Sequence, residues 1–141
     1  NKEVVHVAMD EPYCPNLRRN FSDTAKKTGL KVKGEAVYIC TEGPRFETAN
    51  EIKMYKALGG DVVGMTNVPE VVLAKEMGMC YQAVGIITNW CTGIEGGVTD
   101  HDIIGVMKGN RKLVTRTFIN ALTAKELSQD KCKCKTSLLR L

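Results

Sequence analysis

Residues that could bind a small molecule follow three short apolar runs in the middle of the chain. They are Phe46 and Glu47 in the first polar turn, Met65 and Thr66 in the second, and Asn89 in the third. If the three runs are parallel strands, the turns share one edge of the sheet. That edge, beyond the carboxyl ends of the strands, is where open α/β sheets bind ligands. The sequence therefore predicts a binding site built from these five residues.

The residue types suit a flat polar ring and an anion. A carboxylate at Glu47 can accept hydrogen bonds from ligand N–H groups while Phe46 covers an apolar ring face. The amide of Asn89 offers both a donor and an acceptor, which matches the edge of a heterocycle. Thr66 precedes a predicted helix, so its hydroxyl and the adjacent amides could bind an anion.

Each of these residues also has a structural explanation. Glu47 can simply begin the next helix, where the dipole favours a negative charge. Thr66 can be a helix cap and Asn89 a turn residue, and His6 and His101, taken alone, are interpreted as surface residues. No dinucleotide-binding glycine loop, Walker loop, nucleophile elbow or His-Glu-x-x-His motif is present. Generic motifs therefore do not decide the reaction.

Six cysteines are many for a cytosolic chain of 141 residues. Cys132 and Cys134 lie one residue apart beside lysines, whose charge favours thiolates, so a redox function is one hypothesis. An inert polar tail is the alternative. Zinc would need two further ligands, and no second Cys or His pair is spaced to supply them, so we expect no metal. Cys40 and Cys80 are interpreted as small buried hydrophobes.

The elements that must position these residues alternate between strands and helices. Strands are predicted over residues 30–41, 61–65 and 80–88. Helices are predicted over residues 15–27, 49–58, 67–77 and 101–127. The connections are long enough for right-handed crossovers between parallel strands. The first ten residues are expected to form a strand or an arm, and the tail beyond Gln129 to be loosely held.

Size and composition are those of one globular domain with a real core. The apolar content of 43% and the charged content of 26% are ordinary for soluble proteins. No apolar run approaches the ~20 residues that span a bilayer, and no signal peptide opens the chain, so we expect a cytoplasmic protein without a membrane partner. The net charge of +4 lies largely in a tail without interleaved aromatic residues, so no nucleic-acid partner is expected.

Three motifs around the polar turns resemble the trimeric-type purine nucleoside phosphorylases. They are Glu-Gly-Pro-Arg-Phe-Glu-Thr at 42–48, Gly-Met-Thr-Asn-Val-Pro-Glu-Val-Val-Leu-Ala-Lys-Glu at 64–76, and Ile-Thr-Asn at 87–89. Residues 6–15 resemble the 5′-methylthioadenosine phosphorylase branch in particular. The resemblance implies an α/β fold, with a mixed, largely parallel sheet flanked by helices.

In that family, phosphate attacks C1′ of a purine nucleoside, and negative charge develops on the leaving purine. Catalysis then means stabilising the base and placing the phosphate. By resemblance, Asn89 would hydrogen-bond purine N7 and the 6-substituent, and Glu47 would hold the N1 edge. Phe46 would pack against base and sugar, Met65 would contact the ribose, and Thr66 would bind phosphate.

The resemblance also implies an assembly. His101 matches the position that faces the 5′ end of the sugar, and His6 matches one that reaches a neighbouring subunit's site. A homotrimer or hexamer with shared active sites is therefore expected. No cofactor is expected, because inorganic phosphate is itself a substrate.

The contact residues favour 6-oxopurines. Methylthioadenosine enzymes typically have Ser in place of Glu47 and Asp in place of Asn89. A carboxylate accepts from the N1–H of hypoxanthine or guanine, which adenine lacks, and a site built on such a bond rejects the base without it. We expect phosphorolysis of inosine or guanosine. The alternative substrates are 5′-methylthioadenosine and 5′-methylthioinosine.

One departure from the family is large, because family subunits are about twice this length. Their N-terminal half carries a Gly-rich phosphate loop and an Arg-x-His motif, and neither is present here. We interpret residues 1–141 as the C-terminal part of a single nucleoside phosphorylase domain, an incomplete subunit, with a polar Cys-x-Cys tail at 128–141. That tail resembles those of some hyperthermophilic archaeal members, which use extra disulfides. A Cys14–Cys80 bond would be one of them.

Two other functions stay open. A thiol oxidoreductase would use Cys132 and Cys134 and would work without phosphate. A nucleoside-binding half-domain would bind purines without releasing free base. Both leave the combination of Phe46, Glu47 and Asn89 less well explained.

Overall fold

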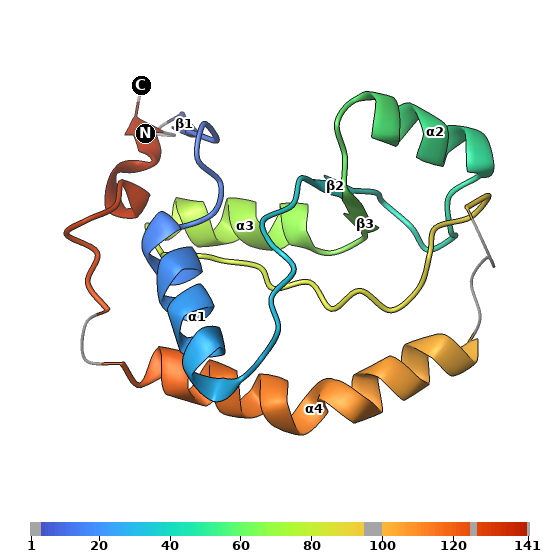
Figure 1. Cartoon of the computed structure of the whole chain (residues 1–141). Helices are drawn as coiled ribbons and strands as arrows, with labels where there is room; N and C mark the ends of the chain where they lie inside the picture. Colours follow the sequence, from blue (N-terminus) through green and yellow to red (C-terminus); the bar gives the residue numbers. More distant parts are fainter. Residues whose placement is uncertain (1–3, 95–99, 125–126, 141) are drawn as a thin grey trace. The chain divides into compact units, whose positions relative to one another are not determined.

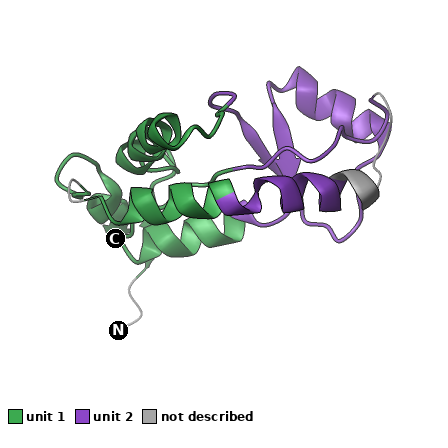
Figure 2. Ribbon diagram, turned by 60° about the horizontal axis from the view of Figure 1, so that its bottom comes forward, with its two compact units in different colours: residues 1–32, 68–84, 113–141 green, residues 33–67, 85–112 purple. Residues whose placement is uncertain are grey.

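The computed structural model describes residues 4–94, 100–124 and 127–140 (Figure 1). Its elements are β1 (Val5–Val7), α1 (Pro15–Thr28), β2 (Tyr38–Cys40), α2 (Ala49–Ala57), β3 (Val62–Gly64), α3 (Asn67–Glu76), α4 (Asp100–Leu122), the 3₁₀ turn η1 (Cys134–Thr136) and β4 (Leu138–Arg140). They form two compact units (Figure 2). Unit 1 comprises residues 1–32, 68–84 and 113–141, and unit 2 comprises residues 33–67 and 85–112. Helix α4 contributes residues to both.

Helix α1 in unit 1 begins and ends where the sequence predicts. Pro15 occupies the first turn, where its missing N–H costs no hydrogen bond. Gly29 ends the helix in the left-handed conformation, with φ of 79°, and the next residue's N–H bonds back to the Ala25 carbonyl at 2.9 Å. One face of the helix is buried through Phe21, Thr24 and Ala25.

The core of unit 1 lies between α1 and the second half of α4. Phe21, Ala25 and Ala121 are buried together. The rings of Phe21 and Phe118 pack at a centroid distance of 4.9 Å with a tilted geometry, which is favourable for aromatic pairs. The hydroxyls of Thr28 and Thr117 bond across the same contact at 2.7 Å.

The C-terminal segment of unit 1 is held in place, so the expectation of a loose tail is wrong. Strand β4 pairs antiparallel with β1, with Val5 opposite Arg140. The N–H of Ala8 donates to the Ser137 carbonyl at 2.8 Å, and the buried Ser137 hydroxyl donates to the Lys75 carbonyl at 3.1 Å. Polar composition indicates that side chains are solvated. It cannot reveal that the backbone of this segment pairs with a strand far away in the sequence.

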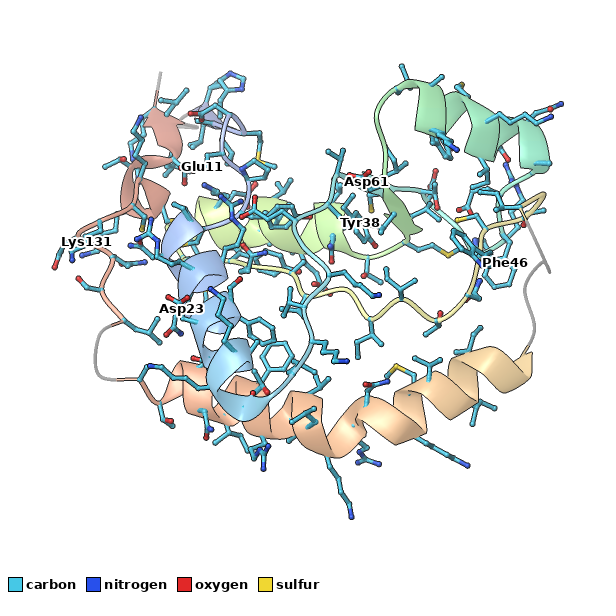
Figure 3. All side chains as sticks on the ribbon, viewed as in Figure 1. Glu11, Asp23, Tyr38, Phe46, Asp61 and Lys131 are labelled. Carbon is cyan, nitrogen blue, oxygen red and sulfur yellow. The ribbon has the colours of Figure 1, made fainter. Side chains whose placement is uncertain are left out.

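Unit 2 is built on a parallel pair of strands, as the sequence predicts. Tyr38 of β2 lies opposite Val62 of β3, and Cys40 lies opposite Gly64. Just before β3, the Asp61 carboxylate accepts from the Val37 N–H at 2.8 Å. Figure 3 labels Tyr38 and Asp61 beside this pair.

The other predicted strand, 80–88, does not form in the structure. A strand requires a ladder of backbone hydrogen bonds, and although the Cys14 N–H bonds to the Tyr81 carbonyl, the described residues form no ladder along this segment. The predicted strand 30–41 is reduced for the same reason to the three residues that face β3. Helix α4 ends at Leu122, before the predicted 127. None of the described helices combines the length and apolar character that crossing a membrane requires.

Candidate functional site

The first two polar turns lie side by side at one edge of the β2–β3 pair. The N–H of Thr41 donates to the Gly64 carbonyl at 2.9 Å, just where both strands end. Gly43 in the first turn has φ of 69°, and a Cβ built on it would lie 2.6 Å from the Met65 sulfur of the second. The positive φ and this close approach both favour glycine. The first two predicted turns therefore meet at one edge of this strand pair.

Glu47 is a buried carboxylate at this edge, with 7% of its surface exposed. The Thr41 hydroxyl donates to Oε1 at 2.7 Å, and no other residue in the described ranges donates to the carboxylate. The N-cap of α2 is the next residue, Thr48, so Glu47 lies outside the helix. A buried carboxylate with acceptor capacity left over is costly unless something supplies donors. A ligand N–H group would be such a donor.

Glu47 lines a cavity of about 380 Å³ in unit 2. The cavity is bounded by Cys40, Thr41, Glu42, Gly43, Arg45, Glu47, Glu51 and Tyr55. Its volume lies within the range of small-molecule sites, ~300–1,000 Å³. The Phe46 ring, labelled in Figure 3, is 59% exposed and so remains available to cover a ligand.

Asn89 keeps part of its hydrogen-bonding capacity. Its Oδ1 accepts from the Thr88 hydroxyl at 2.6 Å, and its Nδ2 donates to the Trp90 carbonyl at 2.8 Å. An amide has two N–H groups and two acceptor lone pairs, so one of each is left for a ligand.

The chain after Asn89 lies beside α2, although the run before it is not a strand. A Cβ built on Gly93 would lie 2.4 Å from the Ala49 Cβ. Burial raises the pKa of the Cys91 thiol, and the charge of Glu47 raises it further. The third predicted turn is thus anchored in unit 2 close to the first.

Thr66 is exposed, directly before α3. Its hydroxyl makes no hydrogen bond to any residue that the structure describes. The helix begins at Asn67, as the sequence predicts. The position fits an anion ligand, and that role stays a prediction.

An ion pair that sequence reasoning did not single out supports the first turn. The Arg45 guanidinium donates to both Glu51 carboxylate oxygens, at 2.7 and 2.9 Å. Glu51 also accepts from the Thr48 N–H, while the Thr48 hydroxyl accepts from the Glu51 N–H, forming a capping box. The Thr-x-x-Glu pattern at 48–51 could have revealed it. The pair fixes the backbone on both sides of Phe46 and Glu47.

This ion pair predicts an unusual titration for Glu51. Hydrogen bonds from Arg45 first, and then from the Thr48 backbone and side chain, lower the Glu51 pKa from 4.5 to about 2. A lowered carboxyl pKa stabilises the fold fully above about 4.5, and this contribution is lost as pH falls through about 2. We expect carboxyl-carbon NMR to show Glu51 still ionised at pH values well below 4.5. Arg45→Gln should move its midpoint upward and Lys53→Gln should not. An ordinary Glu51 midpoint in the unchanged chain would contradict the pairing.

The remaining predicted residues lie elsewhere or outside the description. His6 is exposed in β1 of unit 1, opposite Leu139. His101 belongs to the first turn of α4, and its side chain lies outside the described residues. Cys132 and Cys134 lie in unit 1, where they meet Cys14 and Cys80.

Known proteins resemble this chain over nearly its whole length. A sequence profile of the phosphorylase superfamily matches residues 1–123. A probable 6-oxopurine nucleoside phosphorylase of Dictyoglomus turgidum is 44% identical over 137 residues, covering 96% of this chain and 51% of the relative. A probable S-methyl-5′-thioinosine phosphorylase of Thermodesulfovibrio yellowstonii is 41% identical, covering 97% and 52%.

The fold of this chain also resembles that of a solved structure. A methylthioadenosine phosphorylase from an Antarctic soil metagenomic library matches with a TM-score of 0.84 and 26% identity, over 98% of this chain and 50% of that one. The match confirms the predicted α/β fold. The chain spans about half the length of the curated relatives it matches.

Proposed function

This chain belongs to the phosphorylase superfamily, and we propose that the complete protein containing it is a purine nucleoside phosphorylase. It converts a purine nucleoside and phosphate into the free base and pentose 1-phosphate. The observation that carries the proposal is the buried Glu47 carboxylate, which lines a small-molecule cavity at the sheet edge. Residues 1–141 are the C-terminal part of a single domain in this proposal.

The reaction gives each residue a task. A phosphate oxygen forms a bond to C1′ while the C1′–N9 bond breaks, and the electron pair leaves with the purine. The free N–H of Asn89 donates to N7, where the charge develops, and so stabilises the leaving base. Thr66 contributes one donor to the phosphate. The other phosphate ligands come from the part of the subunit that precedes this chain.

A 6-oxopurine nucleoside, inosine or guanosine, is the proposed substrate. Glu47 accepts from the N1–H that 6-oxopurines carry, and the Asn89 amide donates to O6 or N7. Adenine has a lone pair at N1, which would face the carboxylate without a proton between them. The relatives' names include both 6-oxopurine and 5′-methylthio nucleosides, so 5′-methylthioinosine and 5′-methylthioadenosine are the alternative substrates.

The proposal includes an assembly and a setting. A homotrimer or hexamer brings His6 to a neighbouring subunit's site, while His101 faces the sugar's 5′ end within its own. The protein acts in cytoplasmic purine salvage and needs no cofactor. Its six cysteines are all free thiols in the structure.

The test is phosphorolysis by the complete protein. Hypoxanthine release from inosine is followed with and without phosphate, with adenosine and 5′-methylthioadenosine assayed in parallel. We expect phosphate-dependent release that favours inosine. Faster turnover of 5′-methylthioadenosine would overturn the base preference and keep the reaction. Binding of inosine without any base release would favour the nucleoside-binding half-domain.

A further inference from the structure

Four cysteines from three distant segments converge in unit 1. Cys14 precedes α1, Cys80 follows α3, and Cys132 and Cys134 come from the C-terminal segment. Their four sulfur atoms all lie within 4.8 Å of one another. The premise that nothing could complete a zinc site around the Cys-x-Cys pair is therefore wrong. The missing pair comes from two segments that sequence spacing cannot connect.

The sulfur positions nearly match a tetrahedron around one metal ion. Zinc–sulfur bonds of ~2.3 Å place the sulfurs of a tetrahedral site ~3.8 Å apart. The Cys80 and Cys132 sulfurs are 3.6 Å apart, and the widest separation in the cluster stays within 4.8 Å. Side-chain rotations that move the sulfur atoms by about an ångström would close the remaining difference.

The backbone around the cluster is already fixed. The Cys14 N–H donates to the Tyr81 carbonyl at 2.7 Å, which ties the first segment to the second. The Gln129 amide donates to the Gly78 carbonyl at 3.1 Å and to the Cys80 sulfur at 3.5 Å, which ties the third segment to the second. An amide that orients a ligand sulfur is a typical outer support of a metal site.

Burial and charge also fit a bound ion. Cys14 and Cys134 are 0% and 2% exposed, whereas Cys80 and Cys132 are partly open, so an ion could enter from one side. Four thiolates around a divalent ion carry a net charge of about −2. Three exposed lysines flank the Cys-x-Cys pair and offset it: Lys131, labelled in Figure 3, Lys133 and Lys135.

Without an ion, the surroundings of the cluster shift the pKa values of its thiols in different directions. Burial above all raises the pKa of Cys80 to about 11, and burial followed by the Cys132 contact raises that of Cys134 further. Burial also acts to raise the pKa of Cys132, but bonds from the Cys134 backbone and the neighbouring thiols lower it overall. Zinc binds thiolates, so metal binding would displace the protons of all four thiols.

We propose that Cys14, Cys80, Cys132 and Cys134 form a structural zinc site. Four protein ligands leave no open position for a substrate, so the ion's role is to hold the C-terminal segment against the rest of unit 1. This inference does not depend on the nucleoside reaction.

The experiment is a metal analysis of the complete protein, purified under thiol reductant and without chelator from zinc-containing medium. We expect one zinc per chain. Cys14→Ser and Cys132→Ser should each lose it, while Cys40→Ser and Cys91→Ser, which change the two cysteines of unit 2, should keep it. Loss of zinc in the control variants, or protein without zinc that is otherwise folded, would overturn the proposal.

Cobalt substitution provides a second measurement that does not rely on variants. In the unchanged protein, Co²⁺ should give sulfur-to-metal charge transfer in the near ultraviolet and intense ligand-field bands in the red, as tetrahedral tetrathiolate sites do. Zinc should displace it, and chelation should lower the Tm reversibly. A weak octahedral spectrum would reject the site. Two disulfides found by mass spectrometry in zinc-free protein purified without reductant, with no metal uptake after reduction, would assign the cluster to redox chemistry instead.

Discussion

Replacing Asn89 with alanine is expected to lower kcat for inosine phosphorolysis in the complete protein by about 10²- to 10³-fold, as for loss of one donor aimed at developing charge. The donor is the Nδ2 hydrogen that the Trp90 carbonyl leaves free. Its bond to N7 is weak in the bound nucleoside and strong when the purine leaves. The loss should therefore appear mainly in kcat and less in KM.

Two comparisons make this result specific to the amide. Asn50→Ala changes an exposed asparagine within α2 and should leave kcat within about twofold. Asn89→Asp keeps the size of the side chain and replaces the donor by an acceptor, so it should raise adenosine turnover relative to inosine. An Asn89→Ala protein with unchanged Tm and nearly normal kcat would show that Asn89 only shapes its turn through Thr88 and Trp90.

The sequence predicts the fold well where the determinants are local. Helix α1 is bounded by Pro15 and Gly29, whose conformational limits act within one turn. Strands β2 and β3 are short apolar runs followed by polar turns, and their parallel pairing places Gly43 of the first turn beside Met65 of the second. Sequence alone could therefore place the first two turns together.

Determinants that act between distant segments were not predictable in the same way. The run at 80–88 has the composition of a strand, but a strand exists only through hydrogen bonds to a neighbour. Conversely, the segment before β4 is polar, and β4 still pairs with β1 at the other end of the chain. The cysteine cluster is the strongest case, because spacing along the sequence gives no sign that Cys14 and Cys80 reach Cys134.

Replacing Glu47 with glutamine is expected to lower kcat/KM for inosine by about ten- to a hundredfold, the worth of a hydrogen bond to a charged group. The change keeps the size of the side chain and its acceptor for the Thr41 hydroxyl. It removes the charge and offers N–H groups to purine N1. Adenosine presents a lone pair there, so its kcat/KM should hold or rise, and the inosine-to-adenosine ratio should fall.

The inosine-to-adenosine ratio of kcat/KM distinguishes a role of Glu47 in base recognition from a role in supporting the local fold. If Glu47 only supports the turn before α2, Glu47→Gln should lower turnover of both nucleosides equally and should also lower the Tm. Thr41→Val provides the structural comparison, because it removes the internal bond to Oε1 and leaves the carboxylate itself in place. It should cost both nucleosides a similar, smaller factor. Equal losses with Glu47→Gln and Thr41→Val would remove Glu47 from base recognition, since a buried charge that reads N1–H must distinguish the two bases.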